Sequence, residues 1–271
     1  MAGRPIALTI AGSDSSGGAG IQADLRTFSS LGVYGATVLT ALTAQNTRGV
    51  QAVEMMPACF VEAQMASVFD DLEVGAVKTG MLGTAGIIMA VAARIAAFPG
   101  PAVVDPVMVA TSGDMLIQED AVAVLKRDLI PAAALITPNL DEAAVLSEMT
   151  RAETIDDMAA QGHALIAGGA RAVLMKGGHI AGGRADDLLV TGHGAVLIAG
   201  ERVETGNTHG TGCTLSAAIA VYLASGEELE GAVRRGKAYL EAALRAADRL
   251  NVGRGHGPVD HLFALDSPRV G

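Results

Sequence analysis

The segment Asn207-Thr208-His209-Gly210-Thr211-Gly212-Cys213-Thr214-Leu215-Ser216 places two glycines directly before an apolar helical pattern. Gly210 and Gly212 let successive backbone N–H groups converge, and the positive end of the helix that begins near Gly212 reinforces them. The segment therefore predicts an anion site. It is not a P-loop, because the chain contains no Gly-x-x-x-x-Gly-Lys-Ser/Thr sequence. The alternative is an ordinary glycine cap with Thr214 in the first helical turn.

On either side of this segment, short apolar runs alternate with longer helical patterns. Buried strands are expected over residues 6–11, 37–43, 76–79, 102–105, 135–137 and 172–175, with a late strand meander over 186–191, 195–199 and 202–204. Helices are expected over residues 21–31, 60–72, 84–98, 119–129, 154–167, 212–224 and 228–250. Thr154 and Asp157 have the spacing of a capping box. The alternation predicts an α/β fold with a mainly parallel central sheet flanked by helices on both faces.

Bulk composition excludes several classes of protein. We find no repeat or linker in the 271 residues and expect a single domain over residues 1–271. A formal charge of −10 argues against a nucleic-acid surface. The apolar runs are too short for a membrane span or a signal peptide. Cys59 and Cys213 lack metal-type spacing, so we expect free thiols and a cytoplasmic protein.

Polar and glycine residues follow the predicted strands. In open parallel sheets, ligands bind beyond the carboxyl ends of the strands, so these positions are the candidate site. They are Gly12-Ser13-Asp14, Gln45-Asn46-Thr47, Gly80-Met81, Asp105-Pro106-Val107, Asn139-Leu140-Asp141-Glu142 and Lys176-Gly177-Gly178-His179.

A second glycine-rich segment covers residues 12–24. It contains Gly18-x-Gly20-x-x-Ala23, which formally matches a dinucleotide-binding fingerprint. The glycines begin several residues after the strand, and no acidic ribose partner follows the next strand, so we disfavour NAD(P) binding. We expect instead a loop that closes on a small substrate, with Asp24 reaching into the site, or an ordinary flexible connection.

These segments, in this order, resemble the ribokinase-like superfamily. Together with Ala44-Gln45-Asn46-Thr47 and Gly257-Pro258-Val259-x-His261, they are most similar to the hydroxymethylpyrimidine/phosphomethylpyrimidine kinases of thiamine biosynthesis, over residues 6–263. The resemblance implies ATP-dependent phosphorylation of 4-amino-5-hydroxymethyl-2-methylpyrimidine and of its monophosphate. It also implies ATP and Mg²⁺ as cofactors, a small-molecule substrate and a homodimer.

The resemblance assigns the catalytic roles to the glycine-rich helix start. The backbone amides of Gly210, Thr211, Gly212 and Cys213 would hold the transferring phosphoryl group. A helix N-terminus lowers the pKa of a thiol, so Cys213 is a candidate base near neutral pH; alternatively it only positions the acceptor hydroxyl. Lys176 would reach the nucleotide phosphates.

Nucleotide and metal contacts are expected from the neighbouring strand ends. Asn139 and Glu142 match an Asn-x-x-Glu element suited to Mg²⁺ held partly through water, although Asn139 could equally be a helix cap. Asp105 ends a strand and would support the metal or the phosphates. Thr208 would contact phosphate through its hydroxyl.

For the acceptor, the amide of Gln45 could read the ring nitrogen and amino group of a pyrimidine. The resemblance assigns it that role, together with Asp24 and the backbone at Gly12. Met81 would give soft apolar contact with the ring, or would be an ordinary core residue. His209 adjoins the cradle and is either structural or catalytic.

Two other functions fit parts of the pattern. A pyridoxal kinase of the same superfamily is the closest alternative, as main or side activity. Some enzymes of that kind carry a cysteine in the lid, and the corresponding residues 108–114 contain none, which favours the pyrimidine. A non-catalytic ligand-binding protein is disfavoured because cradle, thiol and lysine are all retained.

Overall fold

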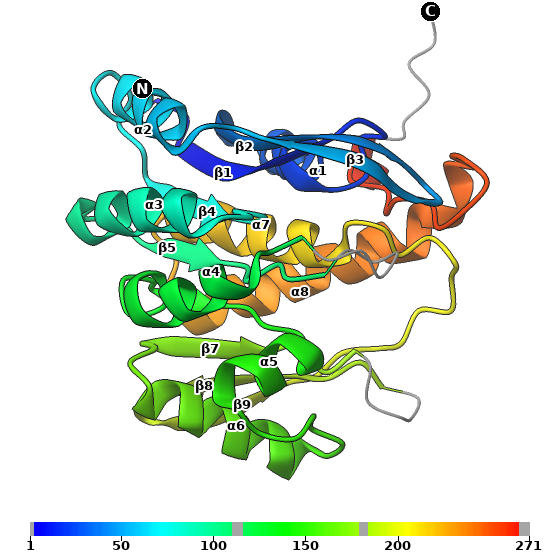
Figure 1. Ribbon diagram of the computed structural model, residues 1–271. Coiled ribbons are helices and arrows are strands. Elements are labelled where there is room, and N and C mark those ends of the chain that lie inside the picture. The colour runs from blue at the N-terminus through cyan, green and yellow to red at the C-terminus, as the bar shows by residue number, and fades with distance from the viewer. Residues whose placement is uncertain (1–2, 110–115, 179–183, 266–271) are drawn as a thin grey trace, which may run out of the picture.

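The computed structural model describes residues 3–109, 116–178 and 184–265 (Figure 1). Within these ranges, nine strands form one sheet in the order β3-β2-β1-β4-β5-β6-β7-β8-β9. The strands are β1 Ile6–Asp14, β2 Tyr34–Asn46, β3 Gly49–Met55, β4 Ala76–Thr79, β5 Ala102–Val104, β6 Leu135–Ile136, β7 Ala172–Met175, β8 Asp187–Thr191 and β9 Gly194–Ile198.

The middle of the sheet is parallel. Strands β2, β1, β4, β5, β6 and β7 run in one direction, whereas β3, β8 and β9 pair antiparallel at the two ends. The four residues of β4 and of β7 are all buried, because helices cover both faces. The carboxyl ends of the parallel strands therefore open onto one edge of the sheet.

Helices cover both faces of the sheet (Figure 1). One face carries α2 Ala58–Phe69, α3 Ala85–Ala97, α4 Glu119–Val124 with the π-helical turn Leu125–Leu129, α5 Leu140–Ser147 and α6 Ile155–Ala167. The other carries α1 Gly20–Ser30, α7 Thr211–Ala224 and α8 Leu229–Ala246, which continues into the 3₁₀ turn Ala247–Arg249. A further 3₁₀ turn spans Phe263–Leu265.

The expected α/β architecture is confirmed, and two strands are placed with the expected bounds, Ala76–Thr79 and Ala172–Met175. The Thr154 and Asp157 capping box is also present. The expected strand over residues 202–204 is wrong: only the preceding Glu201 makes an isolated bridge, to Arg184. Strand β3 was not expected, because most of its residues are exposed and the sequence shows no buried run there.

The segment after α8 returns to the start of α7. The carbonyl of Gly257 accepts a hydrogen bond from the amide of His209 at 3.0 Å, and Pro258 forms a bridge with the same residue. His261 is buried, and its Nε2 lies 3.0 Å from the hydroxyl of Thr214 in the first turn of α7. The tail Gly257-Pro258-Val259-x-His261 thus braces the glycine-rich helix start.

No helix within the described residues is long and apolar enough to cross a membrane.

Candidate active site

The start of α7 forms a backbone cradle. Gly210 caps the helix in the left-handed conformation, with φ of 81°, and a Cβ atom there would lie 1.9 Å from the carbonyl oxygen of Gly18. Only glycine fits this close approach. The first amides of a helix have no intrahelical acceptor, so those of Gly212 and Cys213 are available to an anion. The hydroxyl of Thr214 bonds the Gly210 carbonyl at 2.8 Å, which fixes the turn.

A lysine lies beside this cradle. Lys176 follows β7, and its Nζ lies 2.8 Å from Asp105 Oδ1 and 3.9 Å from Glu142 Oε2. A Cβ atom built on Gly212 would lie 3.3 Å from Lys176 Nζ and 3.4 Å from Asp105 Oδ2. Four of the expected site residues therefore lie together at the carboxyl edge of the sheet, which we call the rim: Lys176, Asp105, Glu142 and Gly212. There the Lys176 ammonium group adjoins the positive end of α7.

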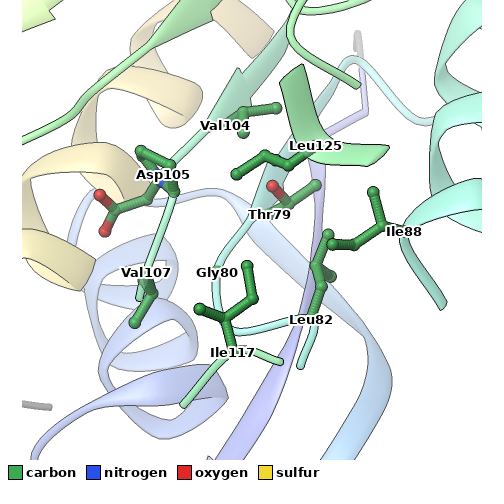
Figure 2. Close-up of a pocket in the computed structure, with 10 residues that line it drawn as sticks. Thr79, Gly80, Leu82, Ile88, Val104, Asp105, Val107, Ile117 and Leu125 are labelled. Carbon is green, nitrogen blue, oxygen red and sulfur yellow. The ribbon is translucent and has the colours of Figure 1, made fainter. Parts of the chain in front are cut away.

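Asp105 is held from several sides. Its carboxylate accepts a hydrogen bond from Thr137 Oγ1 at 3.1 Å and lies 3.5 Å from Ser216 Oγ, in addition to the ion pair with Lys176. Behind Asp105 lies a mostly apolar pocket (Figure 2). Its lining includes Leu82 and Leu125, and the Asp105 carboxylate points away from these side chains (Figure 2). Asp105 therefore lies between this pocket and the charged rim.

Asn139 has the structure of a helix cap. Its side-chain oxygen accepts hydrogen bonds from the amides of Asp141 and Glu142, each at 2.9 Å, and Glu142 Oε2 accepts from the Asn139 amide at 2.8 Å. This is a reciprocal capping box at the start of α5. Both lone pairs of the Asn139 oxygen are engaged, so the expectation that it binds a metal is not supported. Burial raises the pKa of Glu142 to about 7, against the opposing effect of Lys176.

The chemistry of Cys213 differs from expectation. Burial raises the pKa of its thiol to about 11, although the nearby Lys78 ammonium and an amide contact from Gly20 act in the opposite direction. The helix N-terminus does not outweigh the loss of solvent. In the unliganded protein the thiol is therefore protonated at neutral pH, which favours the alternative in which Cys213 positions the acceptor hydroxyl.

Asp24 also differs from expectation. It is fully buried, and its Oδ2 lies 2.9 Å from Lys78 Nζ and 2.5 Å from Thr9 Oγ1. Lys78 is equally buried, on β4. No solvent-accessible surface of Asp24 faces a ligand here, so its placement is that of a counter-ion to Lys78 and not that of a substrate contact.

The remaining acceptor residues gather at the ends of β1, β2 and β4. A Cβ atom on Gly12 would lie 3.3 Å from the sulfur of Met81, and Thr40 Oγ1 donates to the Met81 carbonyl at 2.6 Å. Gln45, near the end of β2, is half-buried, and its amide lies 3.5 Å from His209 Nε2. Gly12, Met81 and Gln45 thus lie on the side of the site that the sequence assigned to the acceptor.

Asp14 and His209 join the two glycine-rich segments. Asp14 Oδ2 lies 2.8 Å from His209 Nε2 and accepts hydrogen bonds from the amides of Gly18 and Ala19. The ring of His209 packs so closely on Gly18 that a Cβ atom there would lie 2.4 Å from it. The glycine-rich segment over residues 12–24 is therefore docked directly onto the start of α7.

Thr208 is half-buried just before the cradle, and its carbonyl accepts from the Thr211 amide at 3.3 Å. Its hydroxyl role stays a prediction. Sequence reasoning gave no role to Asp14 or Lys78. The strand-end rule pointed to Asp14, but no sequence signal paired it with His209, because the two are 195 residues apart. His179 and most of residues 108–114 lie outside the described residues.

A mainly parallel α/β sheet whose strand ends meet a glycine-rich helix start with a lysine beside it is typical of enzymes that transfer phosphoryl groups to small molecules. Comparison with known proteins agrees: residues 14–260 match the family model described as phosphomethylpyrimidine kinase. The chain belongs to this family.

Individual relatives support the same assignment. The chain is 58% identical over 257 residues to the hydroxymethylpyrimidine/phosphomethylpyrimidine kinase of Rhizobium meliloti, covering 95% of this chain and 97% of the relative. Among solved structures, it is similar to phosphomethylpyrimidine kinase from Clostridium difficile, with a TM-score of 0.77 and 43% identity over 88% of this chain and 98% of that one. It is also similar to an ADP complex of Bacillus subtilis pyridoxal kinase, with a TM-score of 0.88 and 38% identity over 97% and 99%.

Proposed function

We propose that this protein transfers the γ-phosphoryl group of ATP to 4-amino-5-hydroxymethyl-2-methylpyrimidine, and again to the resulting monophosphate, in thiamine biosynthesis. The observation that carries the proposal is the position of Lys176, whose ammonium group adjoins Gly212 at the start of α7. A point charge and converging amides at one place suit a transferring phosphoryl group. The family match and the Rhizobium meliloti relative supply the substrate class.

The mechanism follows from the positions of the groups. The amides at Gly212 and Cys213 stabilise negative charge on the transferring group, and Lys176, aligned by Asp105, neutralises the nucleotide phosphates. Phosphoryl transfer passes through a loose transition state, so a strong base contributes little. The protonated thiol of Cys213 therefore orients the acceptor hydroxyl, whose proton passes late in the transfer to an oxygen of the transferring phosphoryl group.

The carboxylates of the rim fit a magnesium ion that arrives with the nucleotide. Mg²⁺ in kinases is bound by one or two carboxylates, water and substrate phosphates. Glu142 and Asp105 have these oxygens beside Lys176, whereas the side-chain oxygen of Asn139 accepts hydrogen bonds from two helix amides. Bound there, the ion would neutralise phosphate charge. Among the described residues no group of three or more His, Cys, Asp or Glu side chains is arranged to hold a metal ion.

Pyridoxal is the second candidate acceptor, favoured by the similarity to the Bacillus subtilis pyridoxal kinase. A coupled assay of ADP release with hydroxymethylpyrimidine, its monophosphate and pyridoxal separates the two. We expect turnover of both pyrimidines and weaker or no turnover of pyridoxal. Turnover of pyridoxal alone would refute the substrate assignment.

The chain is further proposed to form a homodimer through the β2–β3 edge. There the edge strand β3 is mostly exposed, and the side chains of Leu42 and Val53 are 47% and 38% accessible. Sedimentation velocity at micromolar concentration should give a dimer, and a monomer would contradict this. The continuous sheet supports a single domain, and the two free cysteines, Cys59 and Cys213, suit a reducing cytoplasm.

A further inference from the structure

We propose that Thr43 and His209 hold the side-chain amide of Gln45 in one of its two orientations, and that this orientation selects a 4-aminopyrimidine and turns its hydroxymethyl group toward the cradle. The inference rests on the proposed function, because it requires Gln45 to read the ring.

The first constraint comes from Thr43. Thr43 and Gln45 are two residues apart on β2, so their side chains lie on the same face of the sheet. Thr43 Oγ1 lies 2.8 Å from the carbonyl oxygen of Ser13 and 3.1 Å from Oε1 of Gln45. A hydroxyl has one proton, and a carbonyl can only accept it. With that proton given to the closer Ser13 oxygen, Thr43 offers only lone pairs to Oε1, so a half-turn of the amide, which exchanges its oxygen and NH₂ group, places the NH₂ group on the Thr43 side.

The second constraint comes from His209 and agrees with the first. Burial acts to raise the pKa of Asp14, but its hydrogen bonds with His209 and Ser16 lower it to about 2, so Asp14 is an acceptor at neutral pH. His209 Nε2, 2.8 Å away, must therefore carry a proton. The same N–H lies 3.5 Å from Nε2 of Gln45, the atom that the half-turn of the amide replaces with its oxygen. An amide NH₂ facing it would oppose two donors, whereas the amide oxygen faces it favourably. The oxygen of Gln45 therefore belongs on the His209 side.

This orientation matches the order of groups on the proposed substrate. Along one edge of 4-amino-5-hydroxymethyl-2-methylpyrimidine lie the ring nitrogen N3, the 4-amino group and the 5-hydroxymethyl group. The Gln45 N–H pairs with N3 and its oxygen accepts from the amino group. Because the oxygen is on the His209 side, the hydroxymethyl group points the same way, and His209 directly precedes the cradle at Gly210. The reverse amide orientation would turn the reacting hydroxyl away.

The chemical consequence is discrimination between amino and oxo rings. In 5-hydroxymethyl-2-methylpyrimidin-4-one the donor and acceptor are exchanged, with an N3–H donor and a 4-oxo acceptor. A freely rotating amide would bind both rings equally well. An amide held by Thr43 and His209 would face donor with donor and acceptor with acceptor, which is costly at a half-buried site.

The test compares kcat/KM for the amino and oxo compounds in the full-length protein. The wild type should prefer the amino compound by at least ~50-fold. Thr43→Val and Thr43→Ala remove the hydroxyl and should reduce this preference at least ~5-fold, while Thr43→Ser should restore it. Thr37→Val is the matched control: it lies on β2 six residues earlier, roughly 20 Å from Thr43, and should keep the full preference.

His209→Phe gives an independent reading, since it keeps a ring on Gly18 but removes the N–H. This variant should also reduce the preference for the amino compound over the oxo compound. If kcat/KM falls equally for the amino and oxo compounds in both Thr43→Val and Thr43→Ala, the preference is unchanged. That result would overturn the inference and leave the proposed function intact. Absence of turnover of the amino compound by the wild type would instead refute the proposed function.

Discussion

Lys176 Nζ and Asp105 Oδ1 lie 2.8 Å apart at the ends of β7 and β5, and both side chains face Gly212 at the start of α7. Asp105 is itself held by Thr137, so the lysine is aimed before a nucleotide binds. Such preorganised charge is the main protein contribution to phosphoryl transfer.

Removing the lysine should abolish most activity. Lys176→Met is expected to lower kcat/KM for ATP at least ~100-fold, because the phosphates lose their cation and Asp105 is left unpaired. Steady-state kinetics with varied ATP measure the effect. Lys126→Met, which removes an exposed lysine paired with Glu148, is the control and should change kcat/KM by less than about twofold. Equal activity of the two variants would exclude Lys176 from the site.

Cys213 should matter for turnover yet react slowly as a thiol. We expect Cys213→Ala to lower turnover at least ~10-fold, through loss of hydroxyl positioning. In a Cys59→Ser background, alkylation of Cys213 by iodoacetamide should be slow at pH 7 and rise toward a midpoint near 11, because burial raises the thiol pKa to about 11. A midpoint near 7 in the unliganded protein would restore Cys213 as a base.

Two left-handed glycines give a paired test of the cradle. Gly210→Ala places a Cβ atom 1.9 Å from Gly18, so it should lower activity at least ~100-fold and destabilise the fold. Gly226 has a similar φ of 84°, but a Cβ atom there meets nothing within 4 Å. Gly226→Ala should therefore cost only about 1 kcal/mol and leave kinetics unchanged. Comparable kinetics in the two variants would contradict the cradle.

The pair of Asp14 with His209 predicts a pH-dependent contribution to stability. Hydrogen bonds with His209 and Ser16 lower the folded pKa of Asp14 to about 2, from an ordinary value of 3.8. The stabilisation is therefore present above pH 3.8 and is lost as the pH falls toward 2. Urea unfolding should show Asp14→Asn to be less stable than wild type by about 2 kcal/mol at pH 7, with the gap closing below pH 3. A constant gap from pH 7 to 2 would refute this assignment.

The strand-end rule predicted the rim correctly because parallel strands open onto one edge. Lys176, Asp105 and Glu142 converge there although they are far apart in sequence. The rule does not predict the role of Asn139, because the Asn-x-x-Glu pattern fits both a helix cap and a metal site. The two amide contacts at 2.9 Å identify its side chain as a helix cap.

Other features depend on partners that sequence does not reveal. Asp24, on α1, was expected at the acceptor, but it forms a buried ion pair with Lys78 of β4. For Cys213, the helix start was visible in the sequence whereas the burial that raises its pKa was not. Both depend on how α1, β4 and α7 pack together.

Kinase activity is tested most directly by ATP consumption by the wild type with hydroxymethylpyrimidine as the only acceptor, with products separated by chromatography. We expect ADP release that requires the pyrimidine, with the monophosphate appearing first and the diphosphate after it. No pyrimidine-dependent ADP release, or phosphorylation of pyridoxal alone, would contradict the proposed function.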